Sequence, residues 1–126
     1  MHLADQLKTA LGELEKTNLE MRELFESQGG NWKLELIRKR RVQAKQLIDV
    51  SRALTHWAED GSNKTDLDEA KNMFEKMRRS IMMGQTEWPL SLIHDEASLQ
   101  SFSVAARRNG QASEEFFRWI RAQLVK

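Results

Sequence analysis

The side chains of this sequence that could carry out chemistry are few and scattered. The three histidines, His2, His56 and His94, lie far apart, and cysteine is absent, which excludes disulfides, thiolate zinc sites and thiol nucleophiles. His56 and Asp60 are four residues apart and could share a helix face, but a metal site needs three or four ligands. The sequence contains no Gly-rich phosphate loop, no Gly-x-Ser-x-Gly and no His-Glu-x-x-His. We therefore expect no enzyme, no metal, no cofactor and no small-molecule substrate.

A run of basic residues in the first half is the clearest candidate for binding. At 100° per residue, one arc of the helix expected there contains Arg38, Arg41, Lys45 and Arg52. This basic ridge could follow the phosphates of a nucleic acid. Alternatively, acidic residues of the preceding helix could neutralise it. Arg40 lies outside the arc and points toward the apolar side, where it could pair with a carboxylate or reach an interface.

The C-terminal residues 105–120 resemble a helix-turn-helix, the DNA-binding motif of many transposase and phage proteins. Ala106 stands where the two helices would cross, Gly110 at the turn, and Phe116 and Trp119 at the anchoring positions of a second helix. Glu114 and Glu115 depart from the pattern, because they would face phosphates at the start of the recognition helix. The alternative is an ordinary helical hairpin in which these two carboxylates favour the helix N-terminus.

An apolar segment near residues 82–93 is a third candidate. It either fills the core or forms a docking surface for a protein partner. Its members are Met82, Met83, Trp88, Leu90, Leu92 and Ile93.

The elements that must position these residues begin with a heptad pattern over residues 3–27. Its stripe contains Ala4, Leu7, Leu11, Leu14, Asn18, Met21 and Phe25, spaced alternately by three and four. Asn18 is a polar residue within this seam and predicts a specific partner that fixes the register, such as Ser51 or Arg40. Residues 1–27 hold three basic and six acidic side chains, net −3, whereas residues 31–59 hold seven and three, net +4. In a parallel coiled coil the g positions would form ion pairs with the e positions of the partner, but Ala10, Thr17 and Leu24 at g carry no charge, so we expect the partner helix within the chain.

The pattern predicts an all-α fold, a five-helix bundle built on a long N-terminal antiparallel hairpin over residues 3–59. Gly29-Gly30 would end the first helix and Asn31 would cap the second. Thr65 would begin a third helix at 65–84, an apolar connector would follow at 85–94, and a helix pair would fill 95–126, with caps at Asp95 and Ser113. The predicted apolar arc of the second helix contains Leu36, Ile37, Ala44, Leu47, Ile48, Val50, Leu54 and Trp57.

Composition bounds the functional classes. At 126 residues we expect one domain, 1–126, and the balance of 20 basic against 19 acidic residues argues against a partner recognised by the charge of the whole molecule. Neither a signal peptide nor a membrane span is apparent, so we expect a cytoplasmic protein without a membrane partner.

The sequence favours a non-enzymatic, regulatory protein that acts through protein–protein contacts, as a homodimer or other homo-oligomer. The alternative is a nucleic-acid-binding protein that uses the basic ridge, the C-terminal helix pair, or both.

Overall fold

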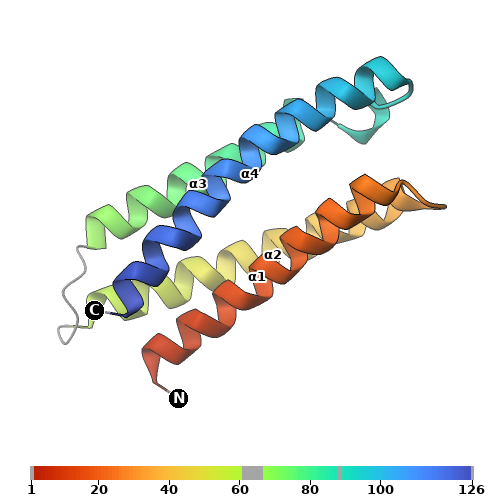
Figure 1. Ribbon diagram of the computed structural model, residues 1–126. Coiled ribbons are helices and arrows are strands. Elements are labelled where there is room, and N and C mark those ends of the chain that lie inside the picture. The colour runs from red at the N-terminus through yellow and green to blue at the C-terminus, as the bar shows by residue number, and fades with distance from the viewer. Residues whose placement is uncertain (1, 61–66, 88, 126) are drawn as a thin grey trace. The chain divides into compact units, whose positions relative to one another are not determined.

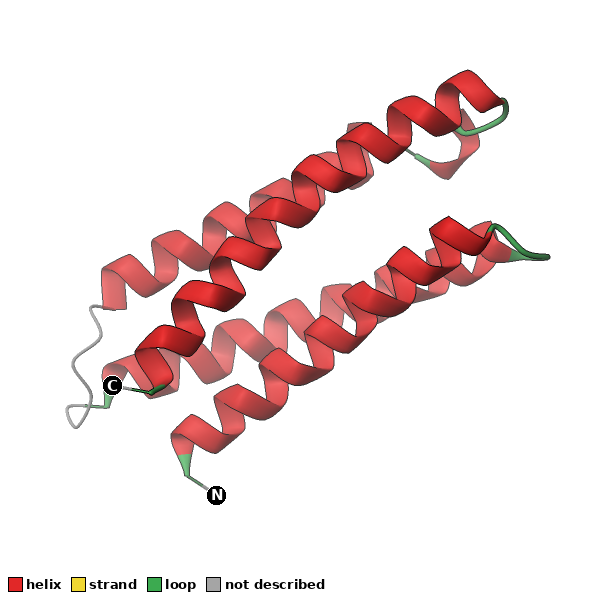
Figure 2. Ribbon diagram, viewed as in Figure 1, coloured by secondary structure: helices red, strands yellow, loops and turns green. Residues whose placement is uncertain are grey.

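A computed structural model describes residues 2–60, 67–87 and 89–125, and it confirms the all-α class. The described residues form helices α1 (Leu3–Ser27), α2 (Trp32–Glu59), α3 (Leu67–Glu87) and α4 (Glu96–Leu124), with one turn of 3-10 helix, η1 (Leu90–Leu92) (Figure 1). The described residues contain no strand (Figure 2). The chain divides into two compact units, Met1–Leu67 and Asp68–Lys126. The expectation of a single domain stays a prediction.

The first unit is an antiparallel hairpin of α1 and α2. The heptad stripe of α1 turns inward as predicted, and Leu7, Leu11 and Leu14 are fully buried. Buried residues of α2 recur at spacings of seven, four and three, which keep them on one helix face, and they are Leu36, Gln43, Leu47, Val50, Leu54 and Trp57.

Three contacts fix the register of this hairpin. Asn18 accepts a hydrogen bond from Gln43, with 2.9 Å between Oδ1 and Nε2. Nearer the turn, Glu20 and Lys39 form an ion pair with 3.1 Å between Oε2 and Nζ. At the turn itself the rings of Phe25 and Trp32 meet edge to face, with centroids 6.1 Å apart. The pairing runs in opposite directions along the two helices, which confirms the predicted antiparallel hairpin.

The turn between α1 and α2 uses a different residue from the one expected. α1 ends at Ser27, and Gln28 adopts the left-handed conformation at the C-cap, with φ 49°, while its N–H donates to the carbonyl of Leu24. Gly30 also has a positive φ, 52°, whereas Gly29 does not. Asn31 occupies the N-cap of α2, but its side chain makes no capping hydrogen bond.

The second unit is formed by α3, η1 and α4, with α3 and α4 antiparallel. The ring centroids of Phe74 and Phe116 lie 5.8 Å apart, in the half of the helix pair nearer the start of α3. At the other end Ser80 Oγ donates to Asn109 Oδ1 over 3.2 Å. Gly84 is in close contact with the Asn109 side chain, so that a Cβ at position 84 would overlap Asn109 Nδ2.

The prediction of five helices is wrong, because the expected C-terminal helix pair is one continuous helix, α4, within the described residues. Gly110 lies inside α4 and has no positive φ. Ser113, expected to cap a fifth helix, is a buried side chain in the middle of α4. The third helix also extends past its expected end at Gly84, to Glu87. Thr65, its expected cap, lies outside the described residues.

Candidate interaction surface

The basic ridge lies at the protein surface. Arg38, Arg41, Lys45 and Arg52 are all exposed. Arg38 pairs with Glu35 of its own helix, at 2.6 Å between Nη1 and Oε1. Within the described residues none of the other three makes an ion pair, so the carboxylates of α1 do not neutralise them. Lys39 of the same helix does reach α1, where it pairs with Glu20.

Apolar side chains share this face of α2, which the sequence pattern did not anticipate. Ile37, Ala44 and Ile48 were expected in the core, but all three are exposed, as is Leu34. The exposed fractions of Leu34, Ile37 and Ile48 are 46%, 40% and 58%. The predicted apolar arc was about 180° wide, and Ile37, Ala44 and Ile48 form its outer end, while Leu36, Leu47 and Val50 suffice to fill the inner face.

Together these residues form what we call the outer stripe of α2. At 100° per residue its members fall within about 80° of arc, on the side opposite Gln43 and Leu47. Their spacings of three and four match those of a helix-packing seam, and the stripe extends over about 27 Å of helix. The outer stripe of α2 consists of Leu34, Ile37, Arg41, Lys45, Ile48 and Arg52.

The two predicted seam residues have separate roles. Asn18 is half-buried and bonds to Gln43, so the suggested partners Ser51 and Arg40 were wrong. Arg40 is also half-buried, and burial lowers the pKa of its guanidinium below the ordinary value. Gln43 was not among the expected partners, which were a hydroxyl group and a charged group. A glutamine within an otherwise apolar arc was the available signal.

The predicted docking segment near residues 82–93 divides between core and surface. Leu90 and Ile93 are buried, with exposed fractions of 8% and 3%. Met82, Met83 and Leu92 are about half exposed. Trp88 lies outside the described residues. Two residues of the segment therefore fill the core, and three remain available at the surface.

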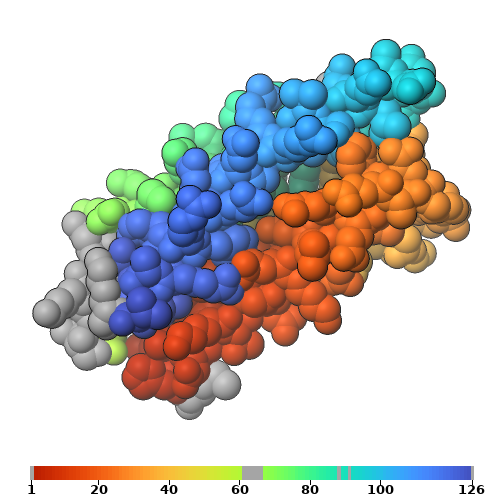
Figure 3. Space-filling model, in the orientation of Figure 1, coloured from red at the N-terminus to blue at the C-terminus, as the bar shows by residue number. Residues whose placement is uncertain are grey.

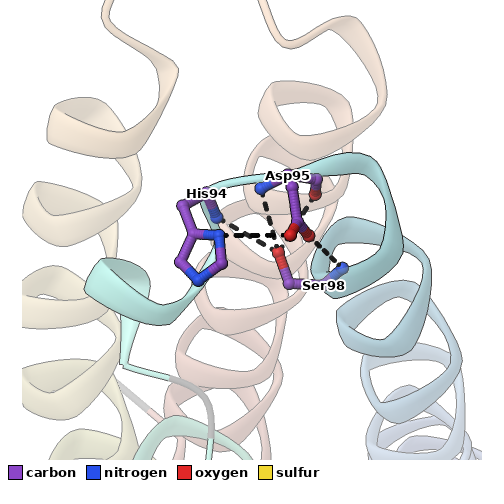
Figure 4. Close-up of polar contacts among 3 residues, drawn as sticks. All are labelled: His94, Asp95 and Ser98. Atoms are coloured by element: carbon purple, nitrogen blue, oxygen red, sulfur yellow. Dashed lines mark hydrogen bonds and ion pairs between the residues drawn. The ribbon is translucent and has the colours of Figure 1, made fainter.

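A histidine, an aspartate and a serine come together at the start of α4, but their geometry is that of a helix cap (Figure 4). Ser98 N–H donates to Asp95 Oδ1 over 2.7 Å, and Ser98 Oγ accepts from the N–H groups of His94 and Asp95 and donates to the Asp95 carbonyl. The His94 imidazole contacts Asp95 Oδ2 at 3.4 Å, not the serine hydroxyl. A nucleophilic serine needs a base on its hydroxyl, so this group caps α4, as predicted for Asp95.

Other kinds of site find little support in the structure. The described residues contain no cluster of three histidine or acidic side chains that could hold a metal ion. None of the described helices has an apolar stretch long enough to cross a bilayer. Comparisons of the chain with protein-family models, with curated proteins and with solved structures find no match. The protein is therefore placed by its architecture alone, as an all-α protein made of antiparallel helix pairs.

Proposed function

We propose that this chain is a non-enzymatic, regulatory protein that binds another protein helix through the outer stripe of α2. The observation that carries the proposal is the mixture of exposed leucine and isoleucine with exposed, unpaired cations at the spacing of a helix seam. Fully burying one such apolar side chain contributes about 1.5–3 kcal/mol, so covering three that are half exposed favours association. A partner helix with apolar and acidic residues satisfies both halves of the stripe.

A protein helix suits this surface better than a nucleic acid does. Phosphates would attract Arg41, Lys45 and Arg52, but they offer nothing to Ile37 or Ile48. These two isoleucines lie along one edge of the stripe and the cations lie along its other half, an arrangement that an acidic amphipathic helix can match side chain by side chain.

The experiment compares wild-type protein with two variants, each of which replaces two exposed β-branched apolar residues by serine. Ile37→Ser/Ile48→Ser changes the stripe, and Val42→Ser/Val104→Ser removes exposed apolar groups elsewhere. Proteins crosslinked in cells to the wild type, identified by mass spectrometry, should be lost from the stripe variant and retained by the control. Equal sets of crosslinked proteins for the two variants would contradict the proposal. Circular dichroism checks that both variants stay helical.

Nucleic-acid binding is a second candidate, and one observation favours it: Arg41, Lys45 and Arg52 are exposed and make no ion pair with a described residue. The C-terminal helix pair no longer supports this candidate, because the residues that resemble a helix-turn-helix form one continuous helix. Three phosphate contacts would give a slope of log K against log salt of about −3. Duplex binding with that slope, abolished by Arg41→Glu/Lys45→Glu, would support this candidate, and absence of binding at low salt would exclude it.

A further inference from the structure

α1 carries a second exposed stripe whose charge is opposite to that of α2. Gly12, Lys16, Leu19, Glu23 and Glu26 follow one another at spacings of four and three, and all are exposed. The exposed fraction of Leu19 is 51%. Neither Glu23 nor Glu26 makes an ion pair with a described residue. We call these five residues the outer stripe of α1; in the view of Figure 3, α1, coloured red to orange, lies at the surface along its length.

The two stripes match when the helices run in the same direction. A shift of 18 positions sets Leu19 beside Ile37 and Glu23 beside Arg41. The same shift brings Glu26 next to Ala44 and Lys45, and Lys16 to Leu34. In the opposite direction, with Leu19 beside Ile48, Glu26 would also meet Arg41 and Glu23 would lie next to Lys45, but Lys16 would lie next to Arg52. The parallel register avoids this like-charge contact.

Within one chain α1 and α2 are antiparallel, so this parallel match can form only between two molecules. We propose that the outer stripe of α2 binds the outer stripe of α1 from a second copy of this chain. This inference rests on the proposed function, since it names the helix that the stripe of α2 binds.

The charges decide which stripes pair. Two α2 stripes facing each other would bring together Arg41, Lys45 and Arg52 of both copies, and two α1 stripes would bring together Glu23 and Glu26 of both. The favourable contact therefore joins unlike surfaces, head to tail. Such a contact leaves a free stripe on each outer copy, so that association continues until a ring closes or a chain of copies forms.

The first experiment reverses the charge of each stripe in turn. Arg41→Glu/Lys45→Glu makes both stripes acidic, and Glu23→Lys/Glu26→Lys makes both basic. In sedimentation at about 50 mM salt, the wild type should associate with increasing concentration, and at about 1 M salt it should dissociate because charges this exposed are screened. Each variant alone should weaken association at least tenfold, and an equimolar mixture of the two should restore it. A mixture that stays as single chains overturns the proposal.

The second experiment tests the register and uses the absence of native cysteine. Leu19→Cys and Ile37→Cys, on separate chains, should form a mixed disulfide on mild oxidation when the two are combined. The matched control combines Leu19→Cys with Ile48→Cys, because position 48 is more exposed than position 37, at 58% against 40%, but lies 11 residues further along α2. A yield for the control equal to that of the first pair overturns the register.

The two proposals fail in different ways. A wild-type protein that sediments as a single chain at every concentration and at low salt overturns self-association alone. The proposed function is then decided by the crosslinking comparison of Ile37→Ser/Ile48→Ser with its control, which does not depend on the mass of the protein.

Discussion

Gln43 of α2 donates a hydrogen bond to Asn18 of α1, with 2.9 Å between Nε2 and Oδ1. Gln43 is buried, with an exposed fraction of 5%, and it lies between the apolar residues Leu36 and Leu47 of the same face. A polar pair inside an apolar seam disfavours other registers, because any slip would separate the two amides and leave buried polar groups without partners.

The first prediction concerns this pair. Asn18→Ala removes the acceptor and should destabilise the protein by about 1–3 kcal/mol, the cost of leaving a buried polar group without its bond. Asn18→Leu/Gln43→Leu replaces both partners with apolar groups and should recover most of that loss. Urea unfolding of the wild type, Asn18→Leu, Gln43→Leu and the double variant gives the coupling energy. A coupling energy near zero would show that the hydrogen bond does not contribute to stability.

The second prediction concerns the contact of Gly84 with Asn109. Gly84→Ala places a methyl group where Asn109 Nδ2 now lies, so Asn109 must move and loses its bond from Ser80. The expected cost is about 1–3 kcal/mol, typical of overpacking. The matched control is Gly110→Ala, because position 110 is also helical but has open space around its Cβ.

Gly110→Ala should instead stabilise the protein by about 0.5–1 kcal/mol, since alanine favours a helix interior over glycine. Thermal unfolding of both variants provides the comparison. Equal effects at the two positions would mean that helix propensity, and not the contact with Asn109, decides the result.

The third prediction concerns the left-handed residues of the turn after α1. Gln28 has φ 49°, a conformation that costs a residue with a side chain about 1–2 kcal/mol and glycine almost nothing. Gln28→Gly should therefore stabilise the hairpin by up to about 1 kcal/mol, allowing for the greater flexibility of glycine in the unfolded chain. Gly30→Ala, at φ 52°, should destabilise it by a similar amount. Opposite signs for the two variants in urea unfolding confirm the prediction, and a loss of stability in both would contradict it.

The sequence predicted the hairpin well because its signals were redundant. The short connection at Gly29-Gly30 and the opposite charges of the two helices both indicated an antiparallel pair, and the Asn18–Gln43 bond agrees with them. Gly110 misled the reading of α4, because a single glycine was treated as the end of a helix. The apolar and small residues continue through it without a change of phase: Phe102, Ala105, Asn109, Ser113, Phe116 and Ile120 are spaced by three and four.

The outer stripe of α2 was harder to predict, for a physical reason. Ile37 and Ile48 are as apolar as the buried leucines and valine, and they lie at one end of the predicted apolar arc. Which of them turns inward depends on how many side chains the inner face can hold. Periodicity gives the direction of the apolar face but not its width, and only packing sets that width.

The last prediction concerns the cap of α4. Hydrogen bonds from the Ser98 backbone and side chain hold the pKa of the Asp95 carboxyl below its ordinary value. A lowered pKa means that the ionised cap stabilises the folded state at pH values above the ordinary value of 3.8. This contribution is lost as pH falls through the lower, folded-state pKa.

Asp95→Ala should therefore lower the unfolding midpoint at pH 7, and the difference from wild type should shrink as the solution is acidified below that range. Glu96→Gln, one residue along in the first turn, removes the same charge without touching the cap and should have a smaller effect. Thermal unfolding monitored by circular dichroism between pH 7 and pH 2 measures both variants. If the difference in unfolding midpoint between Asp95→Ala and wild type stays constant with pH, the carboxylate charge is not what stabilises the start of α4.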